Sequence, residues 1–202
     1  MKFNSILNGD KHMKITTLFT SKRILSSLFI IALLIAPNFS HVAQAATAKE
    51  IDVSVEVALD RFKNDVKGAS EFLANAKGVL VIPNVIRVGF GLGGEYGEGA
   101  LIVGGKTVDY YNTVAGSFGF QIGAQSKNII IIFMEETALT KFRDSLGWRA
   151  GVDGSVAIID QGAGSSVDTD NLKHPIVGFV FGLKGLMVNL SLEGSKFTKL
   201  IK

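Results

Sequence analysis

The sequence contains no cysteine, which excludes disulfide bonds, thiol catalysis and cysteine-ligated metal sites. Histidine is nearly as scarce, because only His174 follows the first 45 residues of the chain. A Ser-His-Asp triad or a multi-histidine metal site would depend on that one residue, and no second ligand is evident. We therefore interpret His174 as a surface residue, predict no bound metal, and expect packing alone to stabilise the fold.

Long apolar runs are also few, and the most prominent one lies near the N-terminus. Lys22 and Arg23 precede the run Ile24–Ala36, and the motif Ala43-Gln44-Ala45 follows it. A basic segment, an apolar segment and an A-x-A site in this order are typical of a secretory signal peptide. The run has thirteen residues, fewer than the roughly 20 that a membrane-spanning helix needs, which disfavours an uncleaved anchor.

We therefore predict a signal peptide over residues 1–45, with cleavage between Ala45 and Ala46. Met13 is an alternative start to Met1, because the basic segment is long. No cysteine follows the apolar run, so a lipid-anchored lipoprotein is excluded. The mature protein is expected to be exported to the periplasm, the outer membrane or the medium.

Removing this leader changes the charge of the chain. The leader holds five of the 21 basic residues and one of the 18 acidic residues, which leaves 16 basic and 17 acidic residues. The net charge is then −1 instead of +3. Nucleic-acid binding needs a basic face that neutralises phosphates, so the composition argues against a nucleic-acid partner.

Residues 46–77 have the pattern of an N-terminal helical segment. Thr47 and Glu50 form a capping box, and Gly68 is expected to break or kink the helix. The apolar stripe either packs on the protein's own core or enters a membrane interface. Residues 47–67 carry four basic and five acidic groups, unlike the Lys/Arg-rich polar face of helices on anionic lipid. The stripe consists of Ile51, Val55, Leu59, Phe62, Val66, Ala69, Leu73 and Ala76.

From Gly78 onward the pattern changes to strands. Bulky residues alternate with small ones over 86–93, 118–123 and 178–183, which leaves one face of each strand nearly bare. The run 128–134 is apolar on both faces and indicates a central strand. One helix is expected near residues 135–144, with acidic residues at its start and basic residues at its end.

These elements predict an α+β fold dominated by β-structure. About eight strands would form a curled antiparallel sheet, barrel- or sandwich-like, covered by the N-terminal amphipathic helix. The β domain, 78–202, would form one globular domain with the segment 46–77. Glycines at every second position would permit tight curling of the sheet or the close approach of another surface.

Gly89, Gly91 and Gly94 match G-x-G-x-x-G, the motif of a loop that binds a dinucleotide pyrophosphate. Such a loop requires a helix directly after the glycines, so that backbone N–H groups meet the phosphates. Gly97 and Gly99 follow instead, and each would cost a helix roughly 1 kcal/mol. We therefore assign these glycines to strand faces and predict no cofactor.

Several polar residues are candidates for a catalytic or metal site. Glu95 and Glu98 suit paired acid and base catalysis, but a solvated hairpin is the simpler interpretation. Residues 168–171 resemble the start of a calcium loop through Asp168, Asp170 and Asn171, yet the later ligands of an EF-hand are missing. An enzyme would need Glu95, Asp153 and His174 to converge in one pocket, and the spacing does not show this.

Two basic residues are candidates for binding a phosphate head group. Arg87 lies on a strand face otherwise lined with glycine, and its planar fork suits a phosphate. Lys184 lies at an expected hairpin between Leu183 and Gly185. A salt bridge to an acidic residue is the structural alternative for both side chains.

Four blocks of the sequence together resemble the SYLF domain family, over about Ala76 to Lys199. Their order and spacing are similar to those of its secreted bacterial branch. The resemblance implies binding to membrane lipids, phosphoinositides among them in eukaryotes, and actin binding in yeast members. It implies no catalytic residues. The blocks are AKGVLVIPNVIRVGFGLGGEYGEGALIV, GSFGFQIGAQSKNIIIIFM, GVDGSVAIID and GLKGLMVNLSLEGSK.

We therefore expect an exported, non-catalytic protein that associates with membrane phospholipid. Actin is not an expected partner of an exported protein. The alternative is a structural or protein-interaction module of the cell envelope, which burial of the helical stripe would favour. The expected lipid contacts are Arg87, Lys184, Ile51, Val55, Leu59 and Phe62.

Overall fold

The structure is a computed structural model that describes residues 46–160, 172–185, 192 and 194–202. The side chains of residues 90, 91, 117–122 and 160 are not part of the description. The described residues belong to one compact unit, Ala45–Lys202. The predicted signal peptide, its cleavage site and the loop with Asp168, Asp170 and Asn171 lie outside the described residues.

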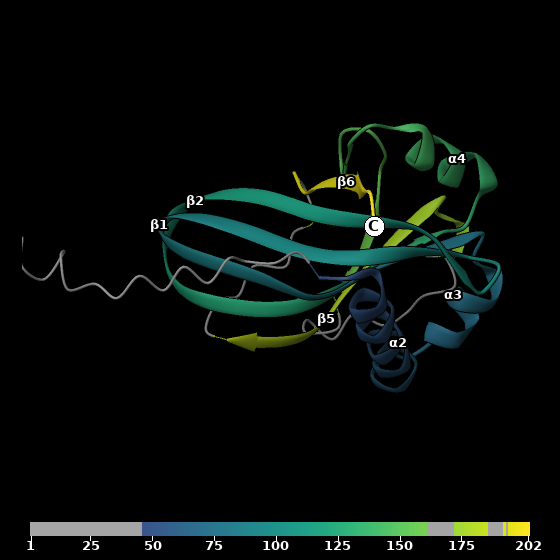
Figure 1. The fold of residues 1–202 in the computed structure, drawn as a ribbon, viewed down its shortest axis with the longest axis horizontal. Coiled ribbons are helices and arrows are strands. Elements are labelled where there is room, and N and C mark those ends of the chain that lie inside the picture. Colours follow the sequence, from purple (N-terminus) through teal and green to yellow (C-terminus); the bar gives the residue numbers. More distant parts are fainter. Residues whose placement is uncertain (1–45, 161–171, 186–191, 193) are drawn as a thin grey trace, which may run out of the picture. The chain divides into compact units, whose positions relative to one another are not determined.

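The predicted β-dominated α+β fold is confirmed, with a curled sheet and helices at the predicted positions (Figure 1). In the described residues the sheet has six strands in the order β3-β6-β2-β5-β4, and β1 also pairs with β2. The elements are α2 (Ala48–Asp65), α3 (Ala69–Asn75), β1 (Gly78–Val103), β2 (Lys106–Phe133), α4 (Glu136–Asp144), β3 (Trp148–Arg149), β4 (Ala157–Asp160), β5 (Ile176–Gly185) and β6 (Lys196–Leu200).

The sheet is built around one long hairpin. β1 and β2 pair antiparallel from Gly78↔Phe133 to Val103↔Lys106. Gly104 and Gly105 form the turn, with φ angles of 58° and 77° that suit a two-residue hairpin turn. Pro83, an ordinary sign of a strand end, does not end β1, because a register shift between Ile82 and Val85 accommodates it. The expected short strands therefore merge into two long ones.

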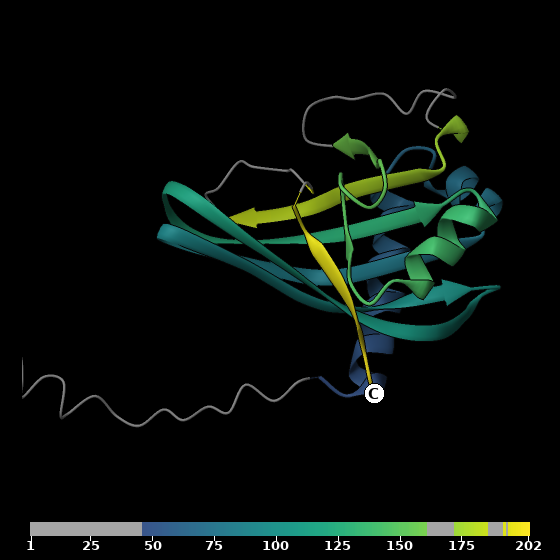
Figure 2. The same ribbon diagram turned by 90° about the horizontal axis from the view of Figure 1, so that it is seen from above.

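The hairpin folds back on itself. The register shifts at Phe90, and both strands bend at the end of the molecule opposite the helices (Figures 1 and 2). A Cβ atom on Gly97 would lie 2.8 Å from Val85, and one on Gly99 would clash with the backbone oxygen of Val81. These glycines therefore permit the close approach of the two halves of β1, as the bare strand faces predicted.

One pair of strands departs from the predicted antiparallel arrangement. β4 pairs with β5 in parallel, from Ala157↔Val177 to Asp160↔Val180. Parallel neighbours need a crossover of about a dozen residues or more, and the chain between the two strands is long enough to provide it. All other strand pairs in the described residues are antiparallel.

The second half of β2 lies at the centre of the fold, as predicted for the run 128–134. Its residues Ile129–Phe133 are fully buried. Ile130 and Ile132 belong to a cluster that α2 and α3 cover, in which Phe62 meets Phe179 with ring centroids 4.8 Å apart. Alternate residues face the inside of the curl and pack with α4, Trp148 and Phe197 in a second cluster.

Candidate functional site

The hairpin folds back on itself in an apolar, charge-free region. Residues 88–94 of β1 and 114–124 of β2 contain no charged residue, and strand pairing brings the two segments together. We call these residues the bend. Figure 2 shows the bend projecting from the sheet, away from α3 and α4.

Large apolar side chains are exposed along the outward row of β1 through the bend. Ile86 is 56% exposed, Val88 53%, Leu92 67% and Tyr96 49%. Val114, the β2 partner of Tyr96, is exposed as well. A hollow of about 400 Å³ lies at the bend and is lined by Val88, Gly89, Leu92, Gly93, Gly94 and Gly123. Solvent-exposed apolar groups that cluster in this way mark interaction sites more often than isolated ones do.

The inside of the folded hairpin is polar next to the bend. The Nζ atom of Lys127 lies 2.9 Å from Oε2 of Glu95, and both side chains are almost completely buried. Lys127 comes from the first layer of the fold, which pairs residues 78–90 with 122–133, and Glu95 comes from the second. This ion pair therefore joins the two layers across the interior.

Further buried polar side chains surround the ion pair. Arg87 is 8% exposed, and its partner across the strands is Gln125, which is also buried. Thr113 lies diagonal to Glu95 on the same face, at a separation of roughly 7–8 Å for such pairs. We call Arg87, Glu95, Thr113, Gln125 and Lys127 the buried polar cluster.

Tyr111 lies beside this cluster, at the start of the apolar core. Its ring packs on Phe142, with centroids 4.8 Å apart, and its hydroxyl has no hydrogen-bond partner. Burial raises the pKa of Tyr111 to about 12, with the charge of Asp109 adding to the effect and Arg143 opposing it. The neutral phenol is thus the form that the folded protein favours.

The two predicted head-group residues do not form one site. Arg87 points into the folded hairpin, whereas Lys184 is exposed. Lys184 pairs with Ser126, which in turn pairs with Ile86 of the outward row, next in sequence to Arg87. Because successive residues of a strand face opposite sides, Arg87 and Lys184 lie on opposite faces of the sheet.

The apolar stripe of the N-terminal helix packs on the sheet. Ile51, Val55 and Phe62 are buried, and Leu59 is half-buried against the same cluster. Asp52 also accepts hydrogen bonds from Thr107 and Tyr110 of β2, 3.0 Å each. Contact of these apolar residues with lipid would therefore require α2 to leave the sheet.

The glutamates considered as a catalytic pair lie on opposite faces of β1. Glu95 points inward to Lys127, whereas Glu98 accepts hydrogen bonds from Tyr96 and Lys202, at 2.6 and 3.0 Å. Burial opposes ionisation of Glu98, but these hydrogen bonds outweigh it and lower its pKa. The expectation of a solvated glycine hairpin here is wrong, because the segment continues β1.

The residues of the enzyme hypothesis are not brought together. Glu95 is buried, whereas Asp153 and His174 are exposed, and Asp153 accepts a hydrogen bond from the backbone N–H of Arg149 at 2.7 Å. Among the described residues, no group of acidic or histidine side chains could hold a metal ion. Nor does any helix in this part of the chain have the length and apolarity to cross a membrane.

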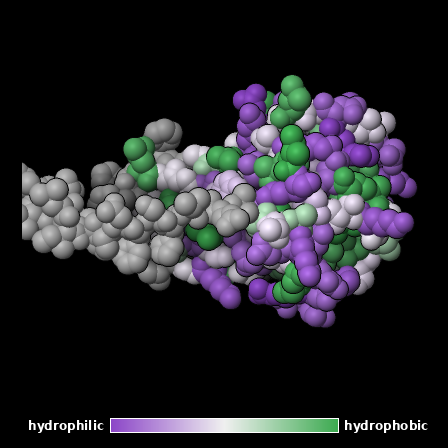
Figure 3. Space-filling model, in the orientation of Figure 1, coloured by the Kyte–Doolittle hydropathy of each residue, from purple (hydrophilic) through white to green (hydrophobic). Residues whose placement is uncertain are grey.

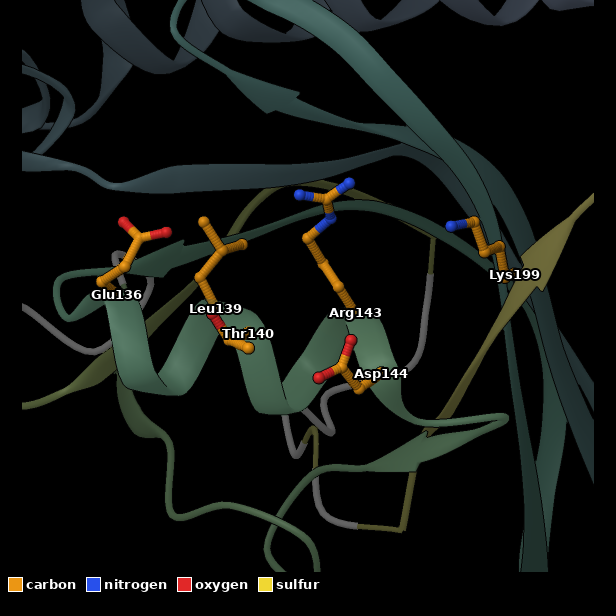
Figure 4. Close-up of a pocket in the computed structure, with 6 residues that line it drawn as sticks. All are labelled: Glu136, Leu139, Thr140, Arg143, Asp144 and Lys199. Carbon is orange, nitrogen blue, oxygen red and sulfur yellow. The ribbon is translucent and has the colours of Figure 1, made fainter.

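A second hollow, of about 270 Å³, lies between α4 and β6 and is lined by charged side chains (Figure 4). Its two cations, Arg143 and Lys199, both pair with Asp109, and the first of these distances is 3.3 Å. Glu136 and Asp144 add two acidic groups to the rim. With its charges already matched, this hollow is a weaker candidate than the bend.

Sequence analysis missed Lys127, Gln125 and Thr113. The signal that could have found Lys127 is its phase, since it continues the buried inward row of Ile129 and Ile131. A single charge in an otherwise apolar row indicates a buried partner.

The comparison with protein families agrees with this fold. Residues 114–200 match the Ysc84 family model, described as "Las17-binding protein actin regulator". Residues 114–200 thus carry the match to the Ysc84 (SYLF) family that the resemblance predicted. The matched region runs from residue 114 of β2 to the end of β6, and thus includes Gln125 and Lys127 of the buried polar cluster. No match was found among curated proteins.

Proposed function

We propose that this SYLF domain binds phospholipid membranes, and that the bend enters the membrane interface. The exposed apolar row of Ile86, Val88, Leu92 and Tyr96 carries the proposal. Fully burying one such side chain contributes about 1.5–3 kcal/mol, so these half-exposed residues offer on the order of 1 kcal/mol each. The family description, which names a binding protein, supports a binding role over a catalytic one.

The bend contains no charge, so its attraction to a membrane is apolar rather than electrostatic. Binding should therefore occur on zwitterionic as well as anionic lipid and should change little with salt. Export of the protein, as its leader predicts, would place the bend beside the lipids of the cell envelope.

Flotation of the purified protein with phosphatidylcholine vesicles tests the proposal. The double variant Ile86→Ser with Leu92→Ser should reduce co-flotation several-fold, since it removes apolar area from the exposed row that runs into the bend. The matched control is Val53→Ser with Val57→Ser, which changes two exposed valines of α2, 54% and 56% exposed. The proposal fails if the wild-type protein does not float, or if the control pair reduces binding and the bend pair does not.

A protein-interaction module of the cell envelope is the second candidate. The burial of Ile51, Val55 and Phe62 favours it, because the helix then has no apolar stripe left for lipid. In that case the bend would bind a protein surface. Vesicles would then not float the wild-type protein.

A further inference from the structure

The buried polar cluster has an excess of positive charge. It contains two cations, Arg87 and Lys127, but only one anion, Glu95. Lys127 pairs with Glu95, whereas Arg87 has no hydrogen bond or ion pair among the residues that the structure describes. Arg87 is nonetheless more than nine-tenths buried.

Such a charge needs a partner. A guanidinium group does not lose its proton in a protein, so Arg87 cannot become neutral on burial as a lysine can. Buried charges are paired in folded proteins, because an unpaired ion in a medium of low dielectric is costly. The partner that the described residues do not provide is one negative charge.

The hydrogen-bonding groups around Arg87 also lack partners. The side-chain amide of Gln125 and the hydroxyl of Thr113 make no hydrogen bond, and Lys127 makes only its ion pair. Glu95 has one carboxylate oxygen without a partner. Donors therefore outnumber acceptors, which favours a ligand rich in acceptor oxygens.

Three glycines connect this cluster with the bend. Gly89 and Gly123 lie two residues from Arg87 and Gln125 on the inward rows, and all four positions are linked by strand pairing. Gly93 likewise lies two residues from Glu95, on the inward row of the second layer. The three glycines line the hollow at the bend, so no side chain at these positions separates the hollow from the cluster.

We propose that the buried polar cluster binds one phosphate group of single negative charge, which enters from the bend. The planar fork of Arg87 would hold two phosphate oxygens, while Lys127 and Gln125 would donate to the others. A free phosphate ion and the phosphodiester of a phospholipid head group share this chemistry. The site does not depend on membrane insertion of the bend.

Isothermal titration of the purified protein in mildly acidic buffer, at fixed ionic strength, tests the site. The probes are inorganic phosphate, short-chain phosphatidylglycerol below its micelle concentration, and the matching diacylglycerol. Binding of either phosphate probe with no binding of the diacylglycerol supports the site, and the probe that binds identifies the source. If neither phosphate probe binds, or if the diacylglycerol binds equally well, the proposal is overturned.

Arg87→Met should weaken binding of the phosphate probe by on the order of tenfold or more, since it removes the unpaired charge. Lys184→Met is the matched control, because it removes an exposed cation from the opposite face. Unchanged affinity in Arg87→Met, or an equal loss in Lys184→Met, contradicts the assignment. Should Arg87→Met fail to fold, Gln125→Leu serves instead and should also weaken binding, with Arg87→Lys retaining part of it.

The two proposals can fail separately. Arg87→Met should still float with phosphatidylcholine vesicles, and the double variant Ile86→Ser with Leu92→Ser should still bind the phosphate probe. Flotation without phosphate binding would leave the membrane proposal standing and remove the phosphate site.

Discussion

The folded β1–β2 hairpin has opposite polarity at its two ends, the end near the helices and the bend. At the end near the helices, Leu80, Ile82 and Ile131 fill the interior, and hydrophilic residues cover much of the surface that Figure 3 shows. Near the bend, Arg87 and Lys127 lie inside, and apolar side chains point outward. The same two strands thus follow the usual distribution of a soluble protein at one end and reverse it at the other.

This reversal separates the part of the fold that apolar packing stabilises from the part that a specific ion pair stabilises. The helical end has two apolar clusters, one on each face of β2, and needs no individual partner. The interior near the bend depends on one ion pair and on glycines that let the layers approach. Substitutions should therefore have different consequences at the two ends.

The largest effect is expected from Glu95→Gln. This change leaves Lys127 buried without its acidic partner, and breaking a buried pair costs about 3–5 kcal/mol. Urea unfolding followed by circular dichroism measures the loss. Replacing both partners, by Glu95→Leu with Lys127→Met, should recover most of the stability. A loss under about 1 kcal/mol in Glu95→Gln, typical of an exposed pair, would show that the interior is hydrated.

Gly99→Ala should cost about 3 kcal/mol, the upper part of the usual range for overpacking. Its new methyl group would meet backbone atoms of Val81 and Ile82, which cannot rotate away. Gly94→Ala is the control, since a Cβ atom there has no neighbour within 4 Å. The difference between their urea midpoints measures the cost of the contact between the two layers of the folded hairpin. Equal midpoints for the two variants would mean that the layers separate freely.

The smallest effect concerns alkaline pH. Because the pKa of Tyr111 is raised to about 12, its contribution to stability is complete below its ordinary value of 10.0 and is lost as pH rises toward 12. A shift of two units corresponds to about 2.7 kcal/mol at most. Tyr111→Phe should lose less stability than the wild type between pH 10 and 11 in urea titrations. Parallel curves for the two proteins would contradict this.

The helical end could be predicted well from the sequence. The stripe of α2 and the doubly apolar run of β2 follow from periodicity, which depends on neighbours a few positions away. The capping box at Thr47 and Glu50 is likewise local, and its hydrogen bonds are present. Gly68, expected to break the helix, has a φ angle of 80° and caps α3.

The bend and its interior could not be predicted in this way. Lys127 meets Glu95 only because the hairpin folds back, and the sequence gives no direct sign of that contact. Pro83 and the glycines are ordinary signs of strand ends, but a bulge and the close contact of layers explain them here. Arg87 differs from its glycine neighbours already in the sequence, but its inward direction depends on the register of the whole hairpin.

The turn at Gly104 and Gly105 sets the order in which the molecule can assemble. A two-residue turn closes the smallest loop, so pairing of β1 with β2 can spread from it with little further entropy cost at each step. A slip of one residue would place Arg87 and Lys127 outside and the apolar row inside. The ion pair between the layers can form only when both Lys127 and Glu95 face inward, so it depends on this register of the two strands.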